Sequence, residues 1–293
     1  MIEAGAIVGV ERRAEGAVEP LVFPGFVDLH VYAPEGLASW GVTGYLLAGR
    51  RPVEPRDPLC LGLHLEGPFL NPRAAGAIPV EELKPVDLAA LDEWLASGVV
   101  RLVTISPELP GGLDAIERVA SGGAIAAVGH TQANSATTRA AIQAGARFAT
   151  HVWNAMLPLR ARSTGPVPRL LLDERVTLGL IPDGRHLHPA VEELTVRVAG
   201  PGRIALTSDL VSLPAHRPDG RLLGGDRCGA ALVARMARFG LPEAAAMASL
   251  VPARLLGLED RGRIARGYRA DLAVLGRDFR PLETFVAGVP VRV

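Results

Sequence analysis

The sequence has few cysteines and no long hydrophobic run, and each shortage excludes a class of protein. Its two cysteines, Cys60 and Cys228, lie far apart and form no CxxC motif, which excludes a disulfide framework and indicates a reducing, cytoplasmic setting. No apolar run reaches the roughly 18–20 residues of a membrane-spanning helix, so we expect no membrane partner. The first residues lack a positive leader followed by an apolar run, so we expect no signal peptide.

The sequence also lacks an excess of positively or negatively charged residues. Lysine plus arginine and aspartate plus glutamate each number 31, and Lys84 is the only lysine. Aromatic residues make up 4% of the chain, and no basic stripe is interleaved with them. Proteins that bind nucleic acids usually carry such a stripe, so we expect no nucleic-acid partner.

Short apolar runs alternate with amphipathic stretches along most of the 293 residues. Eight runs are candidate strands: Phe26–Val31, Val42–Ala48, Cys60–Glu66, Val99–Ser106, Ile125–His130, Phe148–Val152, Val176–Pro182 and Ile204–Asp209. The helical patterns between them include Val86–Ser97, Leu113–Ser121, Ser135–Ala144 and Pro189–Val198. This alternation indicates an α/β fold with a parallel sheet, and eight units predict a (β/α)8 TIM-like barrel. The alternative is an open doubly wound sheet, but no G-x-G-x-x-G turn follows the first run.

The two ends of the chain follow a different pattern. The C-terminal residues form short β-like runs broken by glycine and proline, and the first residues alternate weakly between apolar and polar. We therefore predict a small β-sandwich domain formed by residues 1–22 and 262–293. Residues 23–261 would form the barrel.

Four ionisable residues lie at the ends of four different candidate strands. They are Glu66, His130, His151 and Asp209. Taken singly, each could be an ordinary hydrogen-bonded or capping residue. In a barrel, however, the strand ends converge on one mouth, where active sites of this fold lie. One carboxylate and two histidines suit a divalent metal with an open position for water, and a further carboxylate can take the proton of that water.

Several motifs occur in an order that resembles a known family. They are HLEGPFLNP, GHTQA, THVWNAM, PDGRH and TSD, with TISPE and a tail of the form G-x-I-x-x-G-x-x-A-D-L-A-V-L. Together they resemble the N-acetylglucosamine-6-phosphate deacetylases of the amidohydrolase superfamily. The resemblance runs from about Pro24 to the C-terminus. It implies an enzyme that uses a metal-activated water to convert N-acetylglucosamine 6-phosphate to glucosamine 6-phosphate and acetate.

The resemblance also implies a role for each matching residue. Glu66, His130 and His151 would hold the metal, and Asp209 would be the general base and then the general acid. The remaining residues would bind substrate: Asn154, the backbone at Ala155, Arg162 and His186. Arginine suits the phosphate because its planar fork bonds two oxygens at once. Arg162 would act in its own or a neighbouring subunit, since the resemblance implies a homodimer.

Three departures from the family pattern leave the substrate and the number of metal ions open. Ile78 stands where the family usually has a histidine that contacts the substrate, and RSTG replaces arginine–glutamate–proline–glycine. In the first strand His30 is followed by Tyr32, although many amidohydrolases have His-x-His there for a second metal. A neutral phenol is a poor ligand, so we expect one ion, with His30 as a pocket residue or a weak second-metal ligand.

The ligand set fits Zn²⁺, but Fe²⁺, Mn²⁺ or Co²⁺ would also be accommodated. Two alternatives to the leading interpretation stay open. One is an amidohydrolase that acts on another N-acyl or cyclic amide. The other is a barrel that binds a sugar phosphate without hydrolysing it.

Overall fold

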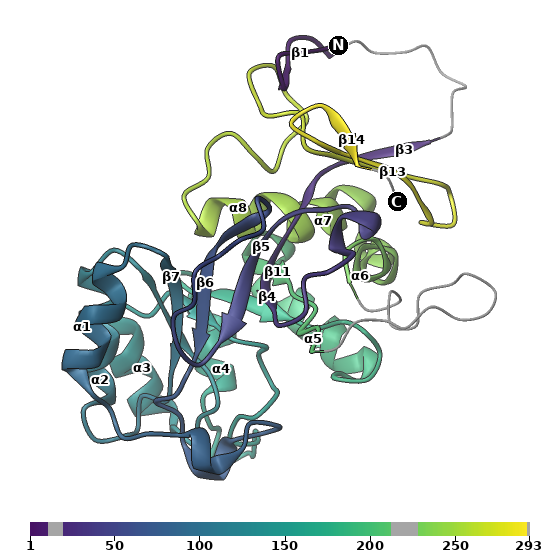
Figure 1. Cartoon of the computed structure of the whole chain (residues 1–293). Helices are drawn as coiled ribbons and strands as arrows, with labels where there is room; N and C mark the ends of the chain where they lie inside the picture. The colour runs from purple at the N-terminus through teal and green to yellow at the C-terminus, as the bar shows by residue number, and fades with distance from the viewer. Residues whose placement is uncertain (11–19, 212–227, 292–293) are drawn as a thin grey trace. The chain divides into compact units, whose positions relative to one another are not determined.

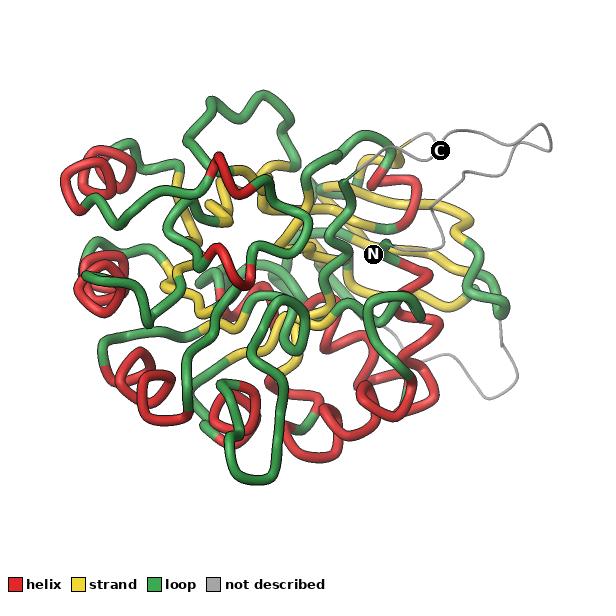
Figure 2. The backbone as a smooth tube through the Cα atoms, turned by 90° about the horizontal axis from the view of Figure 1, so that it is seen from below, coloured by secondary structure: helices red, strands yellow, loops and turns green. Residues whose placement is uncertain are grey.

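The fold is built on a parallel sheet of eight strands. The computed structural model describes residues 1–10, 20–211 and 228–291. Within them the strand order is β4-β5-β6-β7-β8-β9-β10-β11, which follows the chain. Their bounds are β4 (Phe26–Val31), β5 (Val42–Gly49), β6 (Cys60–Glu66), β7 (Val100–Ile105), β8 (Ile125–Val128), β9 (Phe148–Ala149), β10 (Thr177–Leu180) and β11 (Ile204–Leu206). A parallel bridge between Val31 and Leu210 links the first strand to the segment after the last. The predicted (β/α)8 barrel is therefore confirmed (Figure 2).

These segments are strands because both of their faces are buried. All six residues of β4 are buried, and so are five of the six in β7. Continuous apolar runs of this kind are typical of parallel strands, since helices cover the outer face and side chains fill the inner one. The five strands β7 to β11 end one to three residues sooner than their apolar runs predict. β8, β9 and β11 stop before His130, His151 and Asp209, whose φ angles of 48°, 29° and 48° cannot continue a strand.

Helices follow most of the strands. Their bounds are α1 (Leu88–Ala96), α2 (Gly112–Ser121), α3 (Ser135–Gln143), α4 (Val167–Leu172), α5 (Pro189–Ala199), α6 (Ala230–Met236), α7 (Leu241–Ala245) and α8 (Val251–Leu255). Shorter turns are η1 (Leu37–Trp40), η2 (Pro72–Ala74), η3 (Val80–Glu82), η4 (Pro201–Arg203), η6 (Ala237–Phe239) and the π-helical η7 (Ala246–Leu250). Side-chain caps start three of the described α-helices: Asp87 accepts from the backbone N–H of Ala90, Asn134 from that of Thr137, and Nδ1 of His188 from that of Ala190. In Figure 1, α1, α2 and α3 lie on the same side of β6 and β7.

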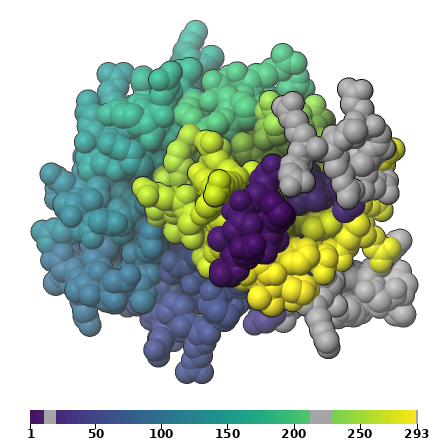
Figure 3. All heavy atoms as spheres, turned by 90° about the horizontal axis from the view of Figure 1, so that it is seen from above, coloured from purple at the N-terminus to yellow at the C-terminus, as the bar shows by residue number. Residues whose placement is uncertain are grey.

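The two ends of the chain meet in a second, antiparallel sheet. Its order is β14-β13-β12-β3, with β3 at Leu21–Pro24, β12 at Leu272–Leu275, β13 at Pro281–Val286 and β14 at Val289–Val291. A hairpin of β1 (Ile2–Glu3) and β2 (Ala6–Ile7) is joined to the C-terminal region by a bridge from Ala6 to Arg269. Figure 3 shows these first residues beside the C-terminal ones. The domain boundaries given above stay a prediction, and residues 11–19 and 292–293 of the small domain lie outside the described chain.

The chain divides into two compact units. The first comprises residues 1–45, 181–185 and 205–293, and it contains β4, β11, α6 to α8 and the antiparallel sheet. The second comprises residues 46–180 and 186–204, and it contains β6 to β10 and α1 to α5. Over the three described ranges, the helices are all too short or too polar to cross a membrane.

Candidate metal centre

Three of the residues predicted from the sequence come together in the second unit. Glu66 ends β6, His130 follows β8 and His151 follows β9, and all three side chains are buried. The Nε2 atoms of His130 and His151 lie 3.0 and 2.8 Å from Oε1 of Glu66. The two Nε2 atoms are 3.1 Å apart. Three ligand atoms from three strand ends thus converge on one point, as the sequence predicts for a metal site.

The chemistry of this group fits a cation. Nδ1 of His130 lies 2.8 Å from the carbonyl oxygen of Ala74. A carbonyl can only accept, so Nδ1 carries the proton and Nε2 of the neutral ring presents a lone pair. That lone pair faces a carboxylate oxygen of Glu66 and the second imidazole, at His151. Electron-rich atoms this close repel one another unless a proton or a metal cation lies among them. The set therefore suits a divalent metal, whose usual bond lengths of about 2.0–2.1 Å place tetrahedral ligands about 3.3 Å apart.

The backbone at both histidines is strained. His130 and His151 have positive φ angles of 48° and 29°, which non-glycine residues rarely adopt. Such a conformation costs about 1–3 kcal/mol and persists only where the surroundings enforce it, most often at functional sites. Asp209, in the first unit, has the same feature with φ of 48°. Three of the four predicted strand-end residues thus share this conformation, which also occurs at Trp153 and Ala155 in the turn after His151 and at Ala4, Phe279 and Ala287 elsewhere.

The turn after His151 contains two of the predicted substrate residues. Asn154 donates from Nδ2 to the His151 carbonyl at 3.4 Å, and the Ala155 carbonyl accepts from the N–H of Thr131 at 3.0 Å. Trp153 anchors the turn, because its Nε1 donates to Oγ1 of Thr195 in α5 at 2.8 Å. The structure thus brings Asn154 and Ala155 into the turn that carries His151.

The segment after β6 lies against His130. Besides the carbonyl of Ala74, it contributes Gly76, whose φ of 61° suits a residue without a side chain. A Cβ added at Gly76 would lie 3.3 Å from the His130 ring and 3.5 Å from the Cβ of Ala155. Ile78 is buried at the end of this segment, and its N–H donates to the Ala75 carbonyl at 3.0 Å. An apolar side chain is therefore accommodated where the family pattern has a histidine.

His30 and Asp209 form a second group, in the first unit. Nε2 of His30 lies 3.4 Å from Oδ1 of Asp209, and the N–H of Asp209 donates to the His30 carbonyl at 3.1 Å. The ring of Tyr32 packs at 5.6 Å from that of His30, with the two planes tilted by 57°. The structure thus pairs the predicted general base with the histidine of the first strand.

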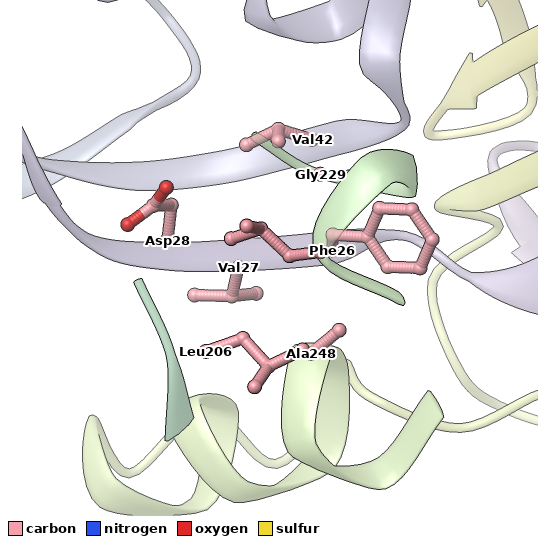
Figure 4. Close-up of a pocket in the computed structure, with 8 residues that line it drawn as sticks. Phe26, Val27, Asp28, Val42, Leu206, Gly229 and Ala248 are labelled. Carbon is pink, nitrogen blue, oxygen red and sulfur yellow. The ribbon is translucent and has the colours of Figure 1, made fainter. Parts of the chain in front are cut away.

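Sequence reasoning missed Asp28, which holds these two segments together. Its carboxylate accepts from the backbone N–H of His30 at 3.0 Å and from that of Ser208 at 3.1 Å. Figure 4 shows Asp28 lining a small pocket with apolar side chains such as Val27 and Leu206. Burial among such groups raises the pKa of Asp28 to about 6, although the hydrogen bonds to its carboxylate oppose the shift. A single acidic residue inside the buried run FVDLHV was the available signal.

The other two predicted substrate residues are exposed. Arg162 lies in the turn between Arg160 and Ser163, which are joined by an antiparallel bridge, and His186 lies in the bend before α5. Both belong to the second unit, as Glu66, His130 and His151 do. Their roles toward a substrate stay predictions.

Comparison with known proteins identifies the family of the chain. The model of the amidohydrolase family matches residues 122–284. The N-acetylgalactosamine-6-phosphate deacetylase of Escherichia coli O157:H7 is 34% identical, over 98% of this chain and 90% of the relative. The N-acetylglucosamine-6-phosphate deacetylase of Bacillus subtilis (strain 168) is 30% identical, and the match covers 78% of this chain and 64% of the relative.

A solved structure is similar over the whole chain. The N-acetyl-D-glucosamine-6-phosphate deacetylase of Mycobacterium smegmatis has a TM-score of 0.86 and 30% identity, and the match covers 100% of this chain and 94% of that one. The chain spans 64% and 65% of the length of the Bacillus subtilis and Lysinibacillus sphaericus relatives. The chain therefore belongs to the amidohydrolase family, and the relatives named here are deacetylases of N-acetylated amino-sugar 6-phosphates.

Proposed function

We propose that the protein is a metal-dependent deacetylase that hydrolyses N-acetylglucosamine 6-phosphate to glucosamine 6-phosphate and acetate. The observation that carries this proposal is the convergence of Glu66, His130 and His151, with the proton of His130 held on Nδ1 by the Ala74 carbonyl. These residues would hold one divalent ion, and we propose Zn²⁺ because imidazole and carboxylate ligands suit it, with Fe²⁺, Mn²⁺ or Co²⁺ as substitutes.

The remaining chemistry falls to Asp209. A divalent ion, when bound, lowers the pKa of a water ligand to about 7 and polarises the amide carbonyl of the substrate. Asp209 accepts a proton from the attacking water and returns it to the amine nitrogen as the carbon–nitrogen bond breaks. One water is consumed, and acetate and the free amine leave. His30, whose imidazole lies 3.4 Å from Asp209, would orient that carboxylate.

Substrate recognition would fall to the turns that surround the ligands. Asn154 and the backbone at Ala155 would meet the phosphate, and Arg162 would pair with it from its own subunit or from a partner in a homodimer. His186 would contact the sugar. A substrate of intermediary metabolism fits a cytoplasmic enzyme, with no nucleic-acid or membrane partner.

The test combines a metal measurement with an activity measurement. The purified protein should contain about one divalent ion per chain by elemental analysis and should release acetate from N-acetylglucosamine 6-phosphate. A His151→Ala variant should lose both the ion and the turnover, because one of three ligands is gone. A metal-replete protein without turnover on any acetylated amino sugar would favour the non-catalytic alternative. Turnover only on other amides would overturn the substrate assignment.

The Escherichia coli relative favours a second candidate substrate, N-acetylgalactosamine 6-phosphate. That relative is an N-acetylgalactosamine-6-phosphate deacetylase, and this chain aligns with 90% of its length. The two sugars differ only in the configuration at C4, so the metal ligands and Asp209 would serve both. Values of kcat/KM for the two substrates, measured with one preparation, decide between them.

A further inference from the structure

Glu108 links three successive loops beside the metal centre. It follows β7, and its carboxylate accepts three hydrogen bonds from neutral donors. Oε1 accepts from Nδ2 of Asn71 at 2.8 Å and from the N–H of Gln132 at 2.6 Å, and Oε2 accepts from the Thr131 hydroxyl. Asn71 belongs to the loop after β6, and Thr131 and Gln132 to the loop after β8. One carboxylate therefore ties together the loops that follow three neighbouring strands.

Two of these contacts are made at the residues directly after His130. The backbone of Thr131 is held further, because its N–H donates to the Ala155 carbonyl at 3.0 Å. The carbonyl of His130 itself accepts from the hydroxyl of Ser106 at 2.6 Å. That hydroxyl in turn accepts from the N–H of Asn71 at 2.8 Å. The backbone around His130 is thus fixed from the loops after both β6 and β7.

This fixation matters because His130 has a strained backbone. Its φ of 48° would relax toward the β region if the following residues were free to move. A rotation of the backbone there would carry the imidazole away from Glu66 and His151. Hydrogen bonds to an ionised acceptor are roughly twice as strong as those between neutral groups, so a carboxylate suits this task better than a neutral side chain.

We propose that Glu108 is a positioning residue for the metal ligand His130. It acts through Thr131 and Gln132 and holds the strained turn in the conformation that aims Nε2 at the metal. The proposal rests on the metal-binding role of His130 given above. Residues that support metal ligands in this way typically change metal affinity by about 10- to 100-fold when they are removed.

The test measures Zn²⁺ affinity by competition with a chromophoric chelator. We expect Glu108→Ala to bind Zn²⁺ about 10- to 100-fold more weakly than the wild-type protein. Glu108→Gln should stay closer to wild type, because an amide can accept from Asn71 and Gln132 and donate to the Thr131 hydroxyl. The matched control is Glu117→Ala, which removes the same charge from an exposed position on α2.

A second readout separates positioning from a general loss of structure. Turnover of Glu108→Ala should recover toward that of the Glu117→Ala control as Zn²⁺ is raised, because only ligand placement is impaired. Thr131→Val leaves Glu108 in place but removes the hydroxyl that donates to it and that accepts from the N–H of Ala133. This variant should weaken Zn²⁺ binding in the same direction, and it replaces Glu108→Ala if that variant does not fold.

The outcomes distinguish this proposal from the proposed function. If the wild-type protein binds Zn²⁺ and both Glu108→Ala and Thr131→Val bind it as tightly as the control, the positioning role is overturned and the deacetylase function stands. A wild-type protein that binds no divalent metal would overturn both.

Discussion

A methyl group added at Gly76 tests whether the segment after β6 sets the position of His130. Gly76 has φ of 61°, and a Cβ there would lie 3.3 Å from the His130 ring, closer than Cβ atoms normally approach a neighbour. Gly76→Ala therefore has two effects. The left-handed backbone costs about 1–2 kcal/mol for any L-residue, and the new methyl group pushes the imidazole by a few tenths of an ångström.

Gly98 offers a matched control for the first effect alone. Its φ is 72°, but a Cβ there would have no neighbour within 4 Å. Gly98→Ala should therefore lose about 1–2 kcal/mol of unfolding free energy, as Gly76→Ala does, without moving a metal ligand. Because metal–ligand bond lengths tolerate only about 0.2 Å, Gly76→Ala should also bind Zn²⁺ about tenfold more weakly.

Two assays separate these effects. Urea unfolding of the EDTA-treated proteins gives the backbone cost, which should be similar for the two variants. Chelator competition gives the Zn²⁺ affinity, which should fall for Gly76→Ala alone. Equal Zn²⁺ affinities for the two variants would refute the argument that the segment after β6 positions His130.

Three further predictions follow from other parts of the structure. Asp209→Asn should keep its metal by elemental analysis but lose about 10²- to 10⁴-fold in acetate release, and undiminished turnover would remove Asp209 from its role. Asp28 has a pKa of about 6 in the fold against about 3.8 when unfolded, so the folded state binds its proton more tightly. This group therefore favours the fold below about pH 4, and roughly 3 kcal/mol of that contribution is lost as the pH rises through 6. Urea unfolding at several pH values should show a shallower decline of stability between pH 4 and 6 for Asp28→Asn; identical slopes would contradict the shifted pKa. Trp153→Phe loses the hydrogen bond to Thr195 and should reduce the unfolding free energy by about 1 kcal/mol, whereas an unchanged value would mean that this bond does not anchor the turn.

The sequence predicted the barrel because each buried strand can be recognised from its own apolar run. Each apolar run is buried on both faces, so a short stretch of chain such as Phe26–Val31 reports its own environment. The buried cluster of Glu66, His130 and His151 followed from the same signal, because the three residues lie where apolar runs end. The helices α6 to α8 were not predicted, because each has only five to seven residues, too few for a periodic pattern.

What the sequence could not predict depends on contacts between distant segments. Asp28 accepts from Ser208, which is 180 positions away, and Glu108 accepts from donors 23 to 37 positions away. An acidic residue in a buried run can signal that the carboxylate has partners, but it does not show which distant donors they are. The left-handed backbone at His130 was equally invisible, because histidine has no preference for that conformation strong enough to reveal it.

The left-handed backbone at His130 and His151 has a consequence for how this protein can change over evolutionary time. Replacing His130 or His151 with glycine would relieve backbone strain of about 1–3 kcal/mol at each position, and it would remove a ligand at the same step. If the activity were no longer selected, replacement of these histidines by glycine would therefore be favoured by stability. Histidine at these two positions therefore persists against a backbone preference that glycine would satisfy.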